Sequence, residues 1–140
     1  MTTIKKSLVI EDTVKLADLQ LMFSAEPKLS EVFRFIETNY HQRITLSDVA
    51  AAVGYSPTYL TNRVRRQTGQ TVQNWIIRRR MEAARSLLLE SDQKIEEIAA
   101  KVGYQSMVHF FRQFRQHHGT SPQAWRKNGG NSQQIRLGVG

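Results

Sequence analysis

The sequence predicts an all-α fold: two helix-turn-helix subdomains joined by a long linker helix, about seven helices in total. Three observations predict it. Apolar residues recur at helical spacing through much of the 140-residue chain. Serine–proline pairs and single glycines mark helix starts and stops between these segments. A stretch that ends near residue 56 recurs about 50 residues later, which indicates a duplicated unit.

The first element is an amphipathic helix that starts at Lys28. Its apolar residues fall at i, i+3, i+4, i+7 and i+11, namely Leu29, Val32, Phe33, Ile36 and Tyr40. A short alanine-rich helix follows in "TLSDVAAAVGY". We expect Ser47 to cap its start, and Gly54 to end it in the left-handed conformation.

The next two helices are the best delimited. One runs from Pro57 to Thr68, with Ser56 as its cap, Pro57 at its first position and Gly69 as its stop. The other, the predicted linker helix, runs from Val72 to Glu90. Its apolar positions are Trp75, Ile76, Met81, Ala84, Leu87 and Leu88.

Two short helices are expected on either side of Gly103-Tyr104, and Ser121-Pro122 starts a last one. The resulting division of the chain is 1–27 as an N-terminal arm or linker stub, 28–71 as the first helix-turn-helix subdomain, 72–91 as the linker helix, 92–127 as the second subdomain, and 128–140 as a Gly/Asn/Gln-rich disordered tail.

The internal repeat is the most informative feature. "DVAAAVGYS" at 48–56 aligns with "EIAAKVGYQ" at 97–105, at an offset of 49. After one inserted residue the offset becomes 50, and it pairs Leu60 with Phe110, Val64 with Phe114, Gly69 with Gly119 and Trp75 with Trp125. Each copy is a small-residue helix, a glycine turn and a more polar helix, which is the helix-turn-helix layout.

The charge distribution indicates an anionic partner. The formal charge is +8 and the pI about 10.2, yet residues 1–40 carry five basic and six acidic groups, a balance of −1. The other hundred residues therefore carry +9. We expect nucleic acid before a membrane surface. No window is long and apolar enough for a membrane span. No signal peptide is recognisable, and the absence of cysteine fits a reducing cytoplasm.

Residues 29–127 resemble the two-helix-turn-helix DNA-binding domain of AraC/XylS-family transcription regulators. The strongest similarity lies in "IEEIAAKVGYQSMVHFFRQFRQHHGTSPQAWRK". It follows the family's pattern I-A, G-aromatic, F-x-x-x-F, G-x-S-P, aromatic-Arg, through Ile98, Ala99, Gly103, Tyr104, Phe110, Phe114, Gly119, Ser121, Pro122, Trp125 and Arg126. The resemblance implies a bacterial sequence-specific regulator, more often an activator that contacts RNA polymerase.

The resemblance makes Ser106–His117 the second recognition helix, with Phe110 and Phe114 facing inward. Its predicted base-contacting residues are Val108, His109 and Arg112. Arg112 is the main candidate because arginine can bond both acceptors of a guanine edge, although a phosphate contact or a solvated position stays open. His109 is equally compatible with packing or solvation. Phe111 either touches a thymine methyl or rests on the neighbouring helix.

In the first unit, Leu60 and Val64 face inward on the corresponding helix. The family's base-contacting positions fall here on Thr58, Thr61 and Asn62, of which Asn62 is suited to an adenine edge. Simple surface polarity or capping explains each of these three equally well. The predicted phosphate contacts, which set register rather than sequence, are Ser56, Arg63, Arg65, Arg66, Arg115, Gln116 and Ser121.

Arg78–Arg80 on the linker helix are expected to form a solvated face, paired with Glu82 or Glu90, rather than to bind DNA. No catalytic residue, metal site or cofactor is predicted, because no phosphate loop, Ser/His/Asp arrangement or metal-ligand spacing is present. Three alternatives stay open: a DNA-binding fragment of a larger regulator with a missing N-terminal sensor domain, a basic protein-interaction module, and a membrane-surface helix in "RRRMEAARSLLLE".

Overall fold

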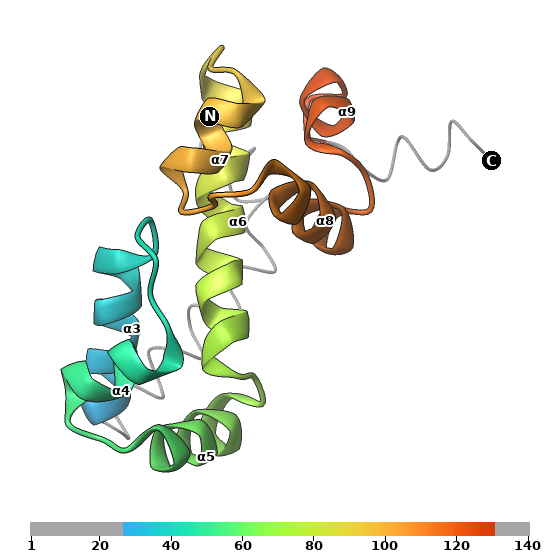
Figure 1. The fold of residues 1–140 in the computed structure, drawn as a ribbon. Helices are drawn as coiled ribbons and strands as arrows, with labels where there is room; N and C mark the ends of the chain where they lie inside the picture. Colours follow the sequence, from blue (N-terminus) through green and yellow to red (C-terminus); the bar gives the residue numbers. More distant parts are fainter. Residues whose placement is uncertain (1–26, 131–140) are drawn as a thin grey trace.

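The computed structural model of the chain describes residues 27–130, and within this range it contains seven α-helices and no strand (Figure 1). The predicted all-α class is confirmed. The predicted N-terminal arm, up to residue 26, and the predicted tail from residue 131 lie outside the described residues. The helices are α3 (Pro27–Asn39), α4 (Leu46–Val53), α5 (Pro57–Thr68), α6 (Val72–Glu90), α7 (Ile95–Lys101), α8 (Met107–His118) and α9 (Pro122–Lys127).

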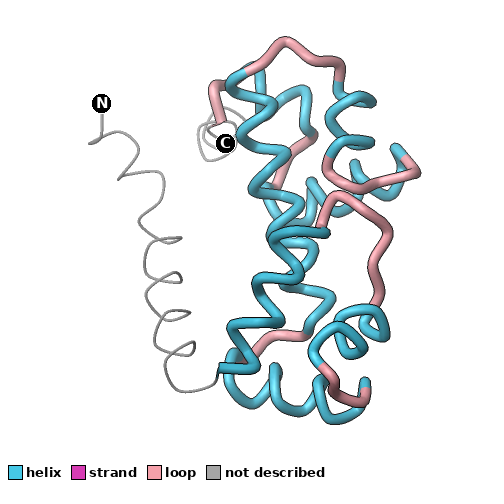
Figure 2. Tube along the Cα trace, turned by 90° about the vertical axis from the view of Figure 1, so that its left-hand side faces the viewer, coloured by secondary structure: helices cyan, strands magenta, loops and turns pink. Residues whose placement is uncertain are grey.

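The long helix α6 forms the axis of the molecule. Helices α3, α4 and α5 lie around its N-terminal half, and α7, α8 and α9 lie around its C-terminal half (Figure 1). The turned view of Figure 2 shows the same two groups, one above the other. The prediction of two subdomains on one linker helix therefore describes the arrangement of the described residues.

Each half has its own hydrophobic core, and the division falls inside α6 between Ile76 and Ile77. Burying apolar side chains is the main stabilising contribution in each half. The first core consists of Leu29, Val32, Ile36, Val49, Ala50, Val53, Leu60, Val64, Val72 and Ile76. The second consists of Ile77, Met81, Ala84, Leu88, Ile98, Ala99, Val102, Tyr104, Phe110, Phe114 and Trp125.

The helix starts are fixed by side-chain caps, and one predicted cap is wrong. Helix α4 is capped by Thr45, not by Ser47: the Thr45 hydroxyl accepts from the Asp48 amide, and the Asp48 carboxylate accepts from the Thr45 amide. This reciprocal pair satisfies two amide donors that the helix itself leaves without partners. Ser56 caps α5 as predicted, and Gly54 ends α4 with a φ of 78°, in the left-handed region.

The C-terminal end of the described range is ordered beyond α9. Asn128, Gly129 and Gly130 form a turn in which the Gly130 amide donates to the Trp125 carbonyl oxygen at 2.8 Å. The sequence predicted that the tail begins at residue 128, whereas in the structure these three residues continue the chain from α9 as this turn. Backbone hydrogen bonds to the last turn of α9 hold them in place.

Candidate nucleic-acid interface

Helices α5 and α8 are the two copies of one surface. Leu60 and Val64 of α5 are completely buried, and so are Phe110 and Phe114 at the equivalent positions of α8. These pairs, at i and i+4, lie on one side of each helix. The predicted inward face of both recognition helices is therefore confirmed.

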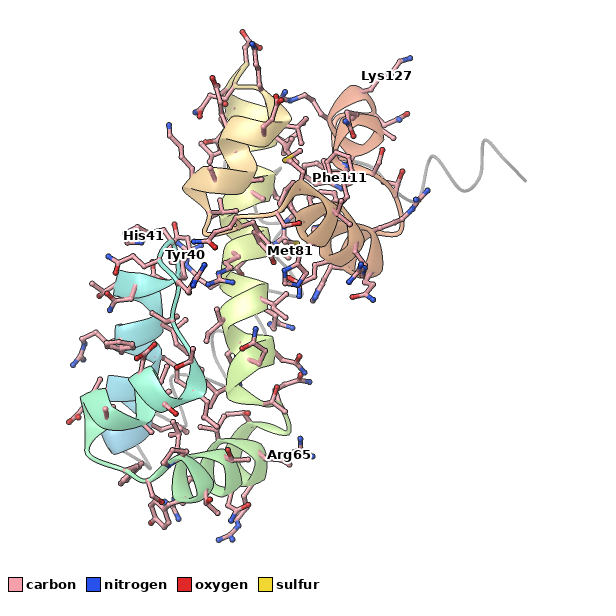
Figure 3. The ribbon with its side chains drawn as sticks, in the orientation of Figure 1. Tyr40, His41, Arg65, Met81, Phe111 and Lys127 are labelled. Carbon is pink, nitrogen blue, oxygen red and sulfur yellow. The ribbon has the colours of Figure 1, made fainter. Side chains whose placement is uncertain are left out.

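The outer side of α5 carries most of the predicted contact residues. Thr58 and Asn62 are exposed, whereas Thr61 is half-buried. Arg65 and Arg66 are exposed, and Figure 3 shows Arg65 on the outer side of α5. These residues offer hydroxyl, amide and guanidinium groups to solvent on one continuous helical face.

Arg63 differs from the other basic residues of α5. It is half-buried, and its guanidinium carbon lies 5.9 Å from the centre of the Tyr59 ring. Tyr59 is 47% exposed and packs edge-to-face on Tyr55 at 4.7 Å. Tyr59 occupies the place in α5 that His109 has in α8, and the sequence reasoning passed over it. The repeat offset of 50 was the signal that could have identified it.

The outer side of α8 repeats this arrangement. Val108 is 67% exposed, and His109, Arg112, Arg115 and Gln116 are exposed as well. Exposing a valine side chain to this extent is unfavourable. All other valines among the described residues are buried. An exposed methyl group on this face is suited to an apolar contact.

Phe111 does not belong to the outer face. It is half-buried and packs against the second core, next to Phe110 at a centroid distance of 6.3 Å. Of the two roles considered for it, the structure favours packing on the neighbouring helices. The equivalent residue of α5, Thr61, is also half-buried, so this position lies at the edge of the face in both copies.

The hydroxyls of Ser56 and Ser121 already serve as helix caps. Each accepts a hydrogen bond from a backbone amide three residues later, Tyr59 and Ala124 respectively, at 3.1 Å. A phosphate at either helix start would therefore meet the remaining free amides of the first turn rather than the serine hydroxyl. Ser106, which caps α8 through the His109 amide at 3.2 Å, is the repeat equivalent of Ser56.

The stretches of sequence that contain α5 and α8 lack acidic residues. No Asp or Glu occurs between Asp48 and Glu82, and none follows Glu97. Both α5 and α8 therefore consist only of neutral and basic residues. A surface of this kind attracts phosphates over the Debye length of about 8 Å at physiological salt.

The linker helix departs from the predicted solvated basic face at Arg80, whereas the predicted pairing with Glu82 is present for Arg79. Arg80 is only 8% exposed, and it donates from Nε to the Tyr40 carbonyl oxygen at 2.8 Å and from Nη2 to the Gln42 carbonyl oxygen at 3.0 Å. Arg79 forms a bidentate pair with Glu37, at 2.6 and 3.0 Å, while Glu82 is 3.8 Å away. Figure 3 shows Tyr40 and His41 at the height of Met81 on α6. The solvated-face prediction is wrong for Arg80 because its guanidinium is bound by two backbone carbonyl oxygens of a loop distant in sequence.

His118, at the C-terminal end of α8, is half-buried in the second core. Its ring stacks on Phe114 at 4.0 Å and lies edge-on to Trp125 at 5.5 Å. Burial, and secondly the positive charge of Arg85, lower the pKa of His118 to about 4. The histidine therefore acts as a neutral packing residue and not as a DNA-facing cation.

Two classes of site have no counterpart in the described part of the chain. Among residues 27–130 no group of three or more His, Cys, Asp or Glu side chains is arranged to hold a metal ion. No helix in the same range is long and apolar enough to cross a membrane.

Comparison with known proteins identifies the family of the chain. A sequence model of the AraC-type helix-turn-helix domain matches residues 49–128, which is more than half of the chain. The chain belongs to the AraC/XylS family. A curated member of similar sequence, the transcriptional activator NphR of a Rhodococcus species, is 39% identical over 100 residues, covering 71% of this chain and 30% of NphR.

Solved structures agree with this AraC/XylS assignment. The C-terminal domain of AraT, a response regulator from Geobacillus stearothermophilus, superposes with a TM-score of 0.72 at 31% identity, over 74% of this chain and 86% of that domain. The DNA-binding domain of AdpA in complex with a target DNA has a TM-score of 0.68 at 30% identity, over 71% and 89%. The chain spans about a third of the length of the curated relatives it matches.

Proposed function

We propose that the chain is a sequence-specific DNA-binding transcription regulator that places α5 and α8 in successive major-groove segments on one face of the duplex. The observation that carries this proposal is the repeated outer face: two capped helices with the same buried and exposed positions, both free of acidic residues. The AdpA domain, which has the same fold and was solved with its DNA, supports it.

Base recognition is assigned to six side chains. Arg112 has two donors for the two acceptors of a guanine edge, whereas Asn62 has one donor and one acceptor, which suit the N7 acceptor and the N6 donor of an adenine edge. The exposed methyl groups of Val108 suit a thymine methyl. The full set is Thr58, Thr61 and Asn62 on α5, and Val108, His109 and Arg112 on α8.

Phosphate contacts position the two helices. Exposed guanidinium groups next to the base-reading residues are the usual means of fixing register on the backbone. We assign this role to Arg65, Arg66, Arg115 and Gln116, with Arg63 at the edge and the first-turn amides of α5 and α9 at Ser56 and Ser121.

The length of the linker helix supports a spacing of about one DNA turn between the half-sites of α5 and α8. Its 19 residues span about 28 Å, and the two subdomains are built around its opposite halves. Half-sites one turn apart are separated by about 34 Å. A linker of this length is compatible with α5 and α8 entering the major groove twice on the same side of the duplex.

We further propose that the regulator acts in the cytoplasm, where bacterial DNA is, and activates transcription. NphR, one of the similar proteins, is named as a transcriptional activator. RNA polymerase as a partner and an N-terminal sensor domain stay predictions from the family resemblance. A pull-down of RNA polymerase by the DNA-bound chain, compared with the free chain, would test the first of these.

Selection of random duplexes by the purified chain, at two salt concentrations, tests DNA recognition. We expect a bipartite motif with half-sites about one turn apart. The variants Asn62→Ala and Arg112→Ala form a matched pair, and each should lose information only within its own half of the motif. No enrichment of any sequence, together with loss of binding at moderate salt, would refute the proposal and leave a non-specific polyanion binder.

A further inference from the structure

Arg80 lies where the two subdomains meet. It sits on α6 just beyond the boundary between the first core, which ends at Ile76, and the second, which begins at Ile77. Its guanidinium is buried, which lowers its pKa, and burying a charge is costly unless hydrogen bonds replace the lost water. The Tyr40 and Gln42 carbonyl oxygens provide such bonds from the loop between α3 and α4, which belongs to the first subdomain.

The same guanidinium also contacts the second subdomain. Its central carbon lies 5.4 Å from the centre of the Tyr104 ring, within the range of a cation–π contact. Tyr104 is buried, donates its hydroxyl hydrogen bond to Gln113 of α8, and contacts the Phe110 ring at 5.2 Å. Arg80 is thereby connected to the recognition helix α8 through a single aromatic side chain.

Gly103 allows this close approach. Its φ is 108°, and a Cβ atom at this position would lie 2.7 Å from the Tyr40 carbonyl oxygen and 2.9 Å from the Arg80 Nε. Both distances are too short for a real side chain. The turn before α8 therefore rests directly on the loop of the first subdomain and on the arginine between them.

One exposed side-chain contact supplements the junction. Arg43, from the loop between α3 and α4, donates to the side-chain oxygen of Gln105, just before α8. The two hydrophobic cores have no residue in common. The angle between the subdomains consequently depends on α6 and on these polar contacts, which we name the Arg80 clasp (Arg80, Tyr40, Gln42, Gly103 and Tyr104).

We propose that Arg80 is a positioning residue that sets the orientation of α8 relative to α5, and thereby the one half-site spacing that the protein accepts. This inference rests on the proposed DNA-binding function. One base pair more or less between the half-sites moves the second by about 3.4 Å and turns it by about 35°. A rigid junction between the subdomains cannot adapt to this displacement, whereas a flexible junction can. Flexibility has a cost, because it lowers the effective concentration of the second recognition helix at its half-site when the spacing is optimal.

The test measures dissociation constants on duplexes that carry the two selected half-sites at the optimal separation and at one and two base pairs more or less. Wild-type protein should lose on the order of 100-fold in affinity for a change of one base pair. Arg80→Gln should lose less than about 10-fold for the same change, with weaker binding at the optimum and unchanged base preference within each half-site.

Two further variants keep the test decisive. Arg80→Lys retains the stem and the charge but lacks the planar fork that reaches both carbonyls, so it should fold and broaden the spacing profile in part. Arg126→Gln is the matched control. Arg126 likewise donates to backbone carbonyl oxygens, those of Leu88, Ser91 and Gln93, but these lie at the C-terminal end of α6 and in the loop after it, in the same half of the molecule as Arg126. It should lower stability and leave the spacing profile as it is.

The possible outcomes distinguish a failure of the role of Arg80 from a failure of the proposed DNA-binding function. Wild-type protein without any spacing preference would refute the two-reader function itself. A strict wild-type profile that Arg80→Lys leaves unchanged would overturn the role of Arg80 and leave the function intact, even if Arg80→Gln does not fold. Equal broadening by Arg126→Gln would also overturn it, because the effect would then follow from lost stability alone.

Discussion

Lowering the pH from 7 to 5 should destabilise the protein through one half-buried histidine, His118. The neutral form of His118 satisfies both of its ring nitrogens: Nδ1, 3.2 Å from the Phe114 carbonyl oxygen, donates to it, and Nε2, 3.1 Å from the Arg85 Nη1, accepts from it. A second ring proton would point at the guanidinium. Burial first, and Arg85 second, lower the pKa of His118 from its ordinary 6.5 to about 4.

The sign of the effect follows from the two pKa values. Between pH 6.5 and pH 4 the unfolded chain binds a proton at this histidine and the folded chain does not, so the free energy of unfolding falls as the pH falls through this window. Above it, both states are neutral and the histidine has no influence. The shift corresponds to about 2 kcal/mol lost between pH 7 and pH 5, which solvent screening of the half-buried ring reduces to about 1 kcal/mol.

Thermal unfolding of wild-type protein and of His118→Thr at both pH values measures this contribution. The repeat suggests the substitution: Thr68, the equivalent residue of α5, donates to the Val64 carbonyl oxygen at 2.7 Å and accepts from Trp75 at 2.9 Å. Wild-type protein should lose about 5 °C more than the variant on acidification. Carboxylates and His117 titrate in both proteins and cancel in the comparison. An equal loss in both would show that His118 does not carry the dependence.

The other predictions concern recognition and the core. Arg112→Ala should cost roughly 1–3 kcal/mol of binding free energy and relax the preference at one base pair. Arg115→Ala should instead weaken binding to all sequences alike. Competition with single-base variants of the site distinguishes the two effects. The logarithm of the affinity should fall with the logarithm of salt at a slope near −5 if about six phosphates are neutralised, and a slope near zero would contradict the charged interface. Phe110→Ala should lower the free energy of unfolding by about 3–5 kcal/mol, and Phe111→Ala by clearly less, in urea denaturation.

Helix boundaries were predictable where the deciding residues adjoin the helix. The observed bounds of α5 and α6 coincide with those predicted, because Ser56-Pro57, Gly69 and Ser91 act on the backbone next to them. Between Thr45 and Ser47 the choice was less local. Both hydroxyls can cap, and the reciprocal bond from Asp48, three residues after Thr45, decided between them.

The role of Arg80 could not be read from the sequence. Three consecutive arginines on a helix point about 100° apart, and nothing in "RRR" indicates which of them meets another part of the chain. The acceptors of Arg80 are backbone carbonyls 38 and 40 residues away, which any residue type would provide. The periodicity thus predicted the buried and exposed sides of α5 and α8, whereas the contact between the subdomains depended on tertiary packing.

The two copies of the repeat have the same helix cap but different residues on the outer face. The caps, Ser56 and Ser106, are the same residue type, but Thr58 is replaced by Val108 and Asn62 by Arg112. In the complex proposed above, the DNA target therefore has two different halves, and one copy of the chain binds it in one orientation only.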